Sequence, residues 1–370
     1  MTAQQKNRLR IAAAAMIALL ASASATIATA ADMGATSAAA KVPDIGALPP
    51  VPVNPDNAPT AARMALGQVL FFDNRLSGNG NFNCSSCHLP NVGWTLPSAF
   101  SLANEGFVER RNPPTLINVG YNKALIWDGR APNLEKQAIG STTNPVHKGQ
   151  NMDKLMKILN DDPKIVAMFQ TAYSSQPNPD DYGRALAVWQ RHFLVTGESD
   201  FDRYMNGNKL ALSELAARGM EIFKGKGGCI ACHNGPNFSD SDFHNTGLKR
   251  NSEFDKPALQ KMLSFDAKRM KDADWEKVSD DGGRYLVTHD RTDWKKFKTP
   301  TLRNLADTAP YMHDGRYQTL DTVIDHYNRG GDSSENQDPR IKPLGLSDIE
   351  KAELKAFLDS LWGALPKLNS

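Results

Sequence analysis

The chain has 370 residues, of which 40% are hydrophobic and 23% are charged, and this length accommodates two domains of ordinary size. These proportions exclude a small disulfide-stapled fold, a disordered chain and a protein with several membrane spans. The formal net charge is only +2, so the charge does not indicate binding to nucleic acid or to an anionic membrane.

The first 30 residues have the pattern of a secretory signal peptide. Three basic residues precede an apolar run at residues 11–20, and small residues follow as far as Ala30. The apolar run is shorter than the ~20 residues that a membrane span needs, which disfavours the alternative of an uncleaved anchor. We therefore expect residues 1–30 to be removed by cleavage before Ala31, followed by export and no stable membrane insertion.

After the leader, the sequence predicts a linker and then a mainly α-helical fold. Residues 31–57 are rich in Ala, Pro and Val without a helical period, and we interpret them as a tether that contributes no core. Strand signals are few. Apolar residues at helical spacing, together with a Ser-x-x-Glu capping box in the last segment, predict four helices. They are expected at residues 61–72, 180–195, 213–224 and from the Ser347 cap to about Trp362.

All four cysteines lie in two C-x-x-C-H motifs. The motifs consist of Cys84, Cys87 and His88 in the first half of the chain, and of Cys229, Cys232 and His233 in the second half. Composition alone predicts about one such motif in a thousand chains of this kind. The spacing lets two thiols add to the vinyl groups of one haem while the adjoining histidine binds the iron. A redox dithiol or a zinc site is the alternative, but zinc sites do not require the adjoining histidine.

The two halves share more than their haem motifs. A Pro-Thr-Leu segment follows each motif, and twelve residues after its threonine come Trp127 in the first half and His313 in the second, each followed by Asp-Gly-Arg. These segments are offset by 186 residues and the haem motifs by 145, so the second half carries 41 extra residues, visible as a charged stretch at about 249–298. The repeat predicts two cytochrome c-like haem domains, at residues 58–195 and 196–370, related by a pseudo-two-fold axis.

Five segments, taken in order, make the chain similar to the bacterial dihaem cytochrome c peroxidase and MauG family. They span most of the chain between residues 60 and 362 and lie at residues 70–77, 111–115, 127–130, 300–304 and 310–315. The resemblance implies a periplasmic enzyme with two covalently bound c-type haems. In this family the N-terminal haem meets hydrogen peroxide, and the C-terminal haem exchanges or stores electrons.

The resemblance also implies roles for individual residues. Trp127 stands where the family has a tryptophan that couples the two haems, although a buried tryptophan by itself is more often a packing residue. Gln137 keeps a pocket position of the MauG branch. A calcium ion between the domains would be bound by the Asn112 side chain and by the backbone carbonyls of Thr308 and Pro310, all oxygen donors suited to a hard cation.

The first departure from the ordinary peroxidases concerns the N-terminal iron. Those enzymes have a histidine, between the first haem motif and an Asn-x-Pro-Thr segment, that closes the iron until the enzyme is reduced. Here residues 89–126 contain no histidine, and Asn104 stands at that position. The resemblance therefore implies an iron that is open from the start, as in MauG.

The second departure concerns the C-terminal iron. The ordinary peroxidases supply a methionine fourteen residues after the position of His313, and this chain has Tyr327 there, as MauG has a tyrosine. A phenolate ligand favours ferric and higher oxidation states, whereas a methionine raises the potential. We therefore expect Tyr327 to bind the second iron, although helical spacing alone makes it a core residue.

The third departure concerns the residue over the peroxide. Twenty residues after the coupling tryptophan the family has a glutamate that acts as acid and base, whereas this chain has His147. We expect His147 to take over this role by receiving and returning the peroxide proton. Iron ligation and a solvent-facing side chain are the alternatives. Ser141 also replaces a usual proline, and Gly227 replaces a tryptophan that MauG uses as a relay toward its partner.

Three functions remain open at this point. The leading hypothesis is a periplasmic dihaem oxidase of the MauG type that uses hydrogen peroxide at the N-terminal haem to modify a Trp or Tyr of a partner protein. The second is a cytochrome c peroxidase that reduces hydrogen peroxide with electrons from small cytochromes or cupredoxins. The third is a non-catalytic electron carrier or sensor. The expected open first iron disfavours the third, and Tyr327 favours the first over the second.

Overall fold

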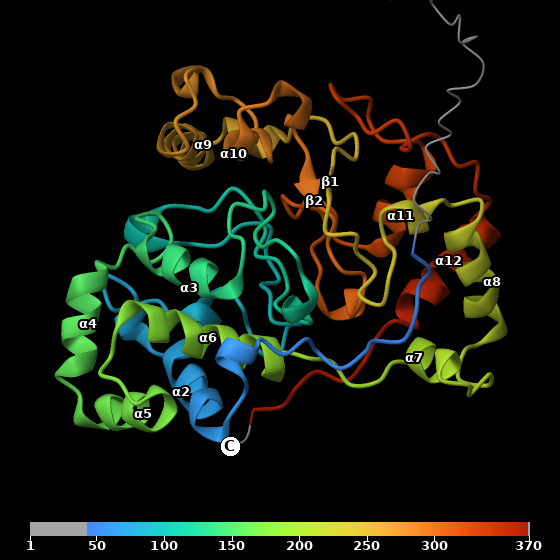
Figure 1. The fold of residues 1–370 in the computed structure, drawn as a ribbon. Coiled ribbons are helices and arrows are strands. Elements are labelled where there is room, and N and C mark those ends of the chain that lie inside the picture. The colour runs from blue at the N-terminus through green and yellow to red at the C-terminus, as the bar shows by residue number, and fades with distance from the viewer. Residues whose placement is uncertain (1–42, 369–370) are drawn as a thin grey trace, which may run out of the picture. The chain divides into compact units, whose positions relative to one another are not determined.

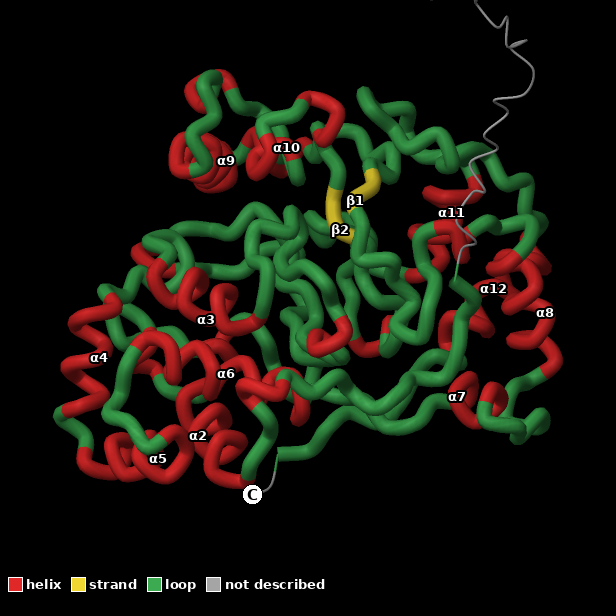
Figure 2. Tube along the Cα trace, in the orientation of Figure 1, coloured by secondary structure: helices red, strands yellow, loops and turns green. Residues whose placement is uncertain are grey.

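The computed structural model describes residues 43–368, so the predicted signal peptide and the start of the predicted linker lie outside the described residues. Helices dominate, as predicted (Figures 1 and 2). No helix in this described range is long and apolar enough to cross a membrane.

Two short strands, β1 at Phe243–His244 and β2 at Phe297–Lys298, pair antiparallel. The α-helices are α2 Ala61–Phe71, α3 Leu134–Thr143, α4 Met152–Asn160, α5 Pro163–Tyr173, α6 Pro179–Phe193, α7 Asp200–Met205, α8 Glu214–Lys224, α9 Pro257–Arg269, α10 Tyr285–Thr288, α11 Leu320–Asn328 and α12 Asp348–Asp359.

The four helices predicted from apolar spacing are confirmed as α2, α6, α8 and α12. The predicted capping box opens α12, since the Ser347 hydroxyl accepts from the Glu350 amide and the Glu350 carboxylate accepts from the Ser347 amide at 2.8 Å. The helix ends at Asp359, earlier than predicted, because the chain then turns so that the Gly363 amide reaches the Asn304 side chain at 3.3 Å.

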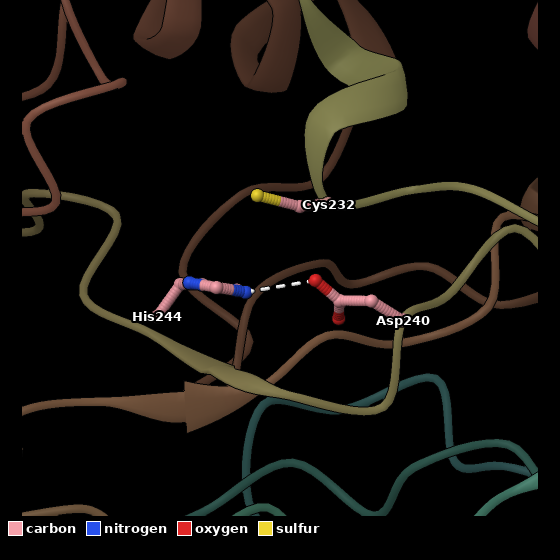
Figure 3. Close-up of side chains that lie close together, drawn as sticks. All are labelled: Cys232, Asp240 and His244. Carbon is pink, nitrogen blue, oxygen red and sulfur yellow. Dashed lines mark hydrogen bonds and ion pairs between the residues drawn. The ribbon is translucent and has the colours of Figure 1, made fainter. Parts of the chain in front are cut away.

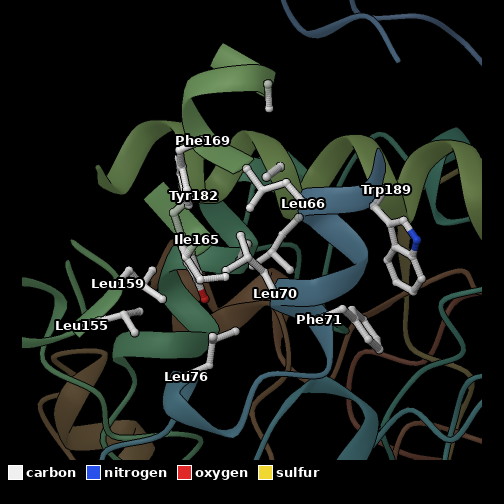
Figure 4. Close-up of a cluster of buried hydrophobic side chains, with 14 of the residues drawn as sticks. Leu66, Leu70, Phe71, Leu76, Leu155, Leu159, Ile165, Phe169, Tyr182 and Trp189 are labelled. Carbon is white, nitrogen blue, oxygen red and sulfur yellow. The ribbon is translucent and has the colours of Figure 1, made fainter. Parts of the chain in front are cut away.

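In the first half, α2 and α6 cross closely enough to require a glycine. A Cβ atom on Gly67 of α2 would overlap the carbonyl oxygen of Ala185 and the Cβ atom of Trp189 on α6. The core around this crossing also includes apolar side chains of α4 and α5 (Figure 4). The Trp189 ring packs edge-on against the buried ring of Trp94, which follows the first haem motif, at 5.8 Å between centroids.

The second half contains a corresponding crossing between α8 and α12. A Cβ atom on Gly219 of α8 would overlap the carbonyl oxygen of Glu353 on α12. Four phenylalanine rings, with centroids 5.2–6.1 Å apart in contacting pairs, fill the core beside it. In both halves the helix before the haem motif thus meets a later helix of the same half at a glycine.

The two ends of the described chain each pack on the core of the other half. Ile45 is only 4% exposed and lies in the second-half core with Phe201 and Phe223. Leu365 and Leu368 pack against the first-half core. The prediction that residues 31–57 contribute no core is therefore wrong at Ile45, because an isolated apolar residue in a Pro-rich segment can still fill a gap in a core formed by other elements.

The charged stretch at 249–298 is folded rather than solvated along its length. It carries α9 and α10, and its Phe254, Leu259 and Leu263 are buried together against Phe100 and Val108 of the first half. The extra residues of the second half therefore pack on a loop that follows the first haem motif.

Replacing Gly219 with Ala should lower the free energy of unfolding by about 1–3 kcal/mol, because the added methyl group has to displace the α12 backbone. Gly46→Ala is the control, since nothing lies within 4 Å of the added Cβ atom, Gly46 does not border the large cavity, and the substitution should be neutral or stabilising by up to ~1 kcal/mol. Urea denaturation of both variants, followed by circular dichroism, measures the difference. Equal stability of the two would contradict the close crossing.

Candidate active site

A cavity of about 730 Å³ borders both C-x-x-C-H motifs. Every site residue predicted from the sequence lies on its wall: Cys84, Cys87, His88, Asn112, Trp127, Gln137, His147, Cys229, Cys232, His233, Thr308, Pro310 and Tyr327. The fold thus brings together residues from all parts of the chain.

The two motifs have the geometry that covalent haem attachment requires. Each begins in a single 3-10 turn, at Cys84–Ser86 and Cys229–Ala231, and all four thiols are free of disulfides. The Nδ1 atom of His88 lies 3.1 Å from the carbonyl oxygen of Trp94, and that of His233 lies 3.0 Å from the carbonyl oxygen of Phe238. Because a carbonyl only accepts, each Nδ1 carries the proton, and each Nε2 keeps its lone pair for iron.

The protonation state of these histidines also suits iron binding. Burial lowers the pKa of His88 to about 4 and lowers the pKa of His233, so both imidazoles are neutral at pH 7. Iron binds the neutral form. The residues present therefore fit two c-type haems, with His88 and His233 as the proximal ligands.

Trp127 is held by backbone groups of both halves. Its Nε1 donates to the carbonyl oxygen of Asn112 at 2.8 Å, and the Asn112 amide donates to the carbonyl oxygen of His313 at 2.8 Å. The Trp127 carbonyl accepts from the amide of Lys298 on β2 at 2.7 Å. The indole is therefore fixed in orientation on the wall of the cavity that borders both motifs.

Two adjacent arginines are buried together with three aspartates, of which Asp128 directly follows Trp127 in the chain. Arg111 donates to Asp128 at 2.6 Å and to Asp281 at 2.7 Å, and Arg110 pairs with Asp281 at 3.1 Å and with Asp266. Although burial alone would raise the pKa of Asp281, the two guanidinium groups hold it well below its usual range. The charged stretch of the second half thus supplies the carboxylates that neutralise buried arginines of the first half.

The predicted proton-transferring residue lies beside the first motif. Gln137 on α3 and His147, three residues after α3 ends at its Asn144 cap, both border the cavity. The Nε2 atom of His147 lies 3.0 Å from Oε1 of Glu109. Glu109 also borders the cavity, and sequence reasoning missed it because its partner is brought near by the fold and not by any spacing along the chain.

Asn104, which stands where the ordinary peroxidases have their closing histidine, is not on the cavity wall. Its amide donates to the carbonyl oxygen of His147 at 3.0 Å, and its Nδ2 donates to that of Pro145 at 3.1 Å. Asn104 therefore joins its own loop to the loop that carries His147.

Tyr327 faces the cavity from α11, whose Leu320 and Ile324 pack in the second-half core. Its hydroxyl makes no hydrogen bond to any residue within 43–368. Burial raises the pKa of Tyr327, so a phenolate at this position needs a cation beside it.

Cys232, Asp240 and His244 lie with their ligand atoms within 4.8 Å of one another (Figure 3). Both ring nitrogens of His244 are engaged, Nε2 with Asp240 and Nδ1 with Asp338, each at 3.0 Å. Burial alone would lower the pKa of His244, but its bond to Asp240 raises the pKa. Since Cys232 belongs to the second haem motif, this cluster forms part of that motif's surroundings.

Known proteins share this fold and these motifs. The family described as di-haem cytochrome c peroxidase matches residues 61–210. The chain is 39% identical over 347 residues to cytochrome-c peroxidase IdrP1 of Denitromonas iodatirespirans, covering 92% of each chain. It is 35% identical over 322 residues to the methylamine utilization protein MauG of Methylorubrum extorquens, covering 84% of this chain and 81% of that one. A solved structure of a MauG-like protein associated with microbial copper homeostasis has a TM-score of 0.72 at 29% identity, covering 85% of this chain and 93% of that one.

The chain therefore belongs to the dihaem cytochrome c peroxidase and MauG family, and it is a dihaem oxidoreductase. The resemblance stated from its motifs is confirmed, and the family implies two c-type haems. A non-catalytic carrier or sensor is set aside. The relatives include both peroxidases and MauG proteins, so membership alone does not choose between these two functions.

The buried charge network predicts a large effect of Asp281→Asn. Removing this carboxylate leaves both buried arginines short of a partner and should lower the free energy of unfolding by about 3 kcal/mol at pH 7. Because the pKa of folded Asp281 is depressed, its stabilisation is present above about pH 4 and is lost as the pH falls. Urea denaturation at pH 7 and at about pH 3 should therefore show a smaller difference between wild type and variant at the lower pH.

Asp274→Asn is the control for this measurement. Asp274 belongs to the same stretch, is 71% exposed and pairs with the exposed Lys277, so its loss should change stability by less than ~1 kcal/mol. A variant of Asp281 that is as stable as that control would contradict a structural role for the network.

Proposed function

We propose that the protein is a periplasmic enzyme in which hydrogen peroxide reacts at the N-terminal haem and the oxidising equivalents modify a Trp or Tyr of a periplasmic partner protein. The observation that carries the proposal is the contrast between the two ends of the cavity. Tyr327 faces the cavity at the second motif, whereas residues 89–126 bring no histidine to the first. A phenolate favours oxidised iron, and an iron without a closing ligand accepts peroxide without prior reduction.

When bound, the two haems supply the iron that binds peroxide and the two electrons that O–O cleavage takes up. In the proposal, Trp127 couples the haems, because its orientation is fixed by hydrogen bonds to Asn112 and Lys298. Gln137 lines the peroxide side of the cavity, and His147 moves the peroxide proton. The chain's own residues thus position the reactants and handle protons.

We also infer a calcium ion beside Trp127. Asn112, Thr308 and Pro310 border the cavity, and neither the side-chain oxygen of Asn112 nor the carbonyl oxygens of Thr308 and Pro310 accept a hydrogen bond from another described residue. Unpartnered oxygens of this kind are the ligands that a hard cation prefers.

The proposed organisation is a signal peptide at 1–30, a linker at 31–57 and two haem domains, at 58–195 and 196–370, related by a pseudo-two-fold axis. The glycine crossings at Gly67 and Gly219 and the two histidine–carbonyl hydrogen bonds support the repeat.

The alternative is a cytochrome c peroxidase that takes electrons from small cytochromes or cupredoxins. The relative that is 39% identical over 347 residues carries that name, which favours this alternative. The two functions differ in where the electrons come from.

The test starts from the oxidised holoenzyme and adds one equivalent of hydrogen peroxide. The proposal expects an immediate change in the haem absorption spectrum without prior reduction, slow oxidation of reduced cytochrome c, and a peroxide-dependent mass change at a Trp or Tyr of a periplasmic protein. Reaction only after reduction of the enzyme, with rapid oxidation of cytochrome c, would establish the alternative instead.

Tyr327→Phe should remove the six-coordinate low-spin ferric signal of the second haem in electron paramagnetic resonance, because the variant has no oxygen to bind the iron. Tyr327→Met should raise the potential of that haem. Tyr317→Phe is the control, since the Tyr317 hydroxyl bonds Arg329 at 3.2 Å and its side chain is not on the cavity wall. A Tyr327→Phe spectrum that matches wild type would make Tyr327 a packing residue only.

A further inference from the structure

Glu109 and His147 form a pair on the wall of the cavity. The Nε2 atom of His147 lies 3.0 Å from Oε1 of Glu109, and the two side chains are 26% and 16% exposed. The carboxylate favours the tautomer of the neutral imidazole that carries its proton on Nε2, which leaves the lone pair on Nδ1. Within residues 43–368, no group makes a hydrogen bond to that Nδ1 atom.

The position of the pair is set by backbone hydrogen bonds. The Glu109 amide donates to the carbonyl oxygen of Ser101 at 2.9 Å, and the His147 amide donates to that of Asn144 at 3.0 Å. The loops that carry the two residues are joined by Asn104, whose amide donates to the carbonyl oxygen of His147. Two segments that are distant along the chain therefore hold the carboxylate and the imidazole together.

The Oε1 atom of Glu109 is buried and accepts no well-formed hydrogen bond from any described residue. A buried carboxylate oxygen without a donor is costly, and Nε2 of His147 lies only 3.0 Å away, so a small turn of the imidazole would complete a hydrogen bond between them. A carboxylate in this position fixes the tautomer and the orientation of an imidazole, as in the Ser-His-Asp triad. The structure thus offers an imidazole that is oriented by a carboxylate on the cavity wall.

We propose that Glu109 and His147 act as one unit that carries the peroxide proton, with His147 as the catalytic residue and Glu109 as the positioning residue. This deepens the proposed function, since it assumes that peroxide reacts at the haem of the first motif. The near oxygen of hydrogen peroxide gives its proton to Nδ1 of His147, while Nε2–H donates to Glu109. The proton then passes to the far oxygen as the O–O bond breaks, and this oxygen leaves as water with both peroxide protons.

The two electrons for this cleavage come from the haem pair. Two further electrons from the partner and two protons from the solvent would balance the reaction, so that both oxygens of hydrogen peroxide end as water. Because Nε2 is occupied by Glu109, that nitrogen is also kept from binding the first iron.

The pair can be tested without peroxide by adding cyanide to the ferric holoenzyme in weak buffer with a pH indicator. Hydrogen cyanide binds ferric haem as the anion and gives up a proton. If Nδ1 of His147 accepts this proton, wild type releases clearly less than one proton per cyanide bound at the first haem. Glu109→Gln and His147→Gln should each release about one proton and bind cyanide at least ~10-fold more slowly, within the range that a positioned acid–base group contributes.

The double variant decides whether the two residues act as a unit. Glu109→Gln combined with His147→Gln should be no slower than either single variant. Glu105→Gln is the matched control, since Glu105 is exposed in the same loop and should behave as wild type. Multiplicative effects of the two substitutions, or release of a full proton by wild type, would overturn the pair.

Cyanide binding also separates this inference from the proposed function. Wild-type proton retention together with absent peroxide reactivity would leave the pair intact and reject the function. Conversely, rapid reaction with peroxide in all variants, with equal cyanide kinetics, would reject the pair and leave the function. In the resting Glu109→Leu variant, His147 is free to bind the first iron, which would give a low-spin first haem. If adding His147→Gln returns that haem to high spin, the result further supports the role of Glu109 in keeping His147 away from the iron.

Discussion

Two adjacent arginines in the interior determine how the second half must meet the first. Arg110 and Arg111 are buried, and buried guanidinium groups are tolerated only where carboxylates pair with them. Asp266 and Asp281 come from the charged stretch of the second half, Arg110 being 171 residues from Asp281. The network therefore holds that stretch against the first half. Glu109 directly precedes the two arginines in the chain, and Asp128, which pairs with Arg111, directly follows Trp127.

Much of the fold follows from local patterns. The helices at 61–71 and 348–359 could be predicted from apolar spacing and a capping box. The haem motifs could be predicted because each five-residue C-x-x-C-H segment has the spacing that haem attachment requires. Glu109, Asp281 and Ile45 could not be predicted in the same way. Each acts through a partner on a distant segment, so its burial and its contacts exist only after the loops have been placed by the rest of the fold.

Only a few residues are expected to distinguish the two functions found in this family, which are peroxide reduction and the modification of a partner protein. The haem motifs and the glycine crossings suit either function, since the dihaem family includes relatives named for both. Under the proposed function, the difference lies in the side chains expected at the irons, Tyr327 and the Glu109–His147 pair. A change of electron donor or substrate can therefore occur without any change in the scaffold, as expected where function depends on sites placed on a common fold.

The crossed packing of the two chain ends affects the order in which the protein can fold. A chain is synthesised and exported from its N-terminus, yet the first-half core is completed by Leu365 and Leu368. Part of that core therefore stays uncovered until nearly the whole chain has been synthesised. For the two c-type haems that the family implies, this order leaves the first motif in an incompletely covered domain while the second motif is still being synthesised.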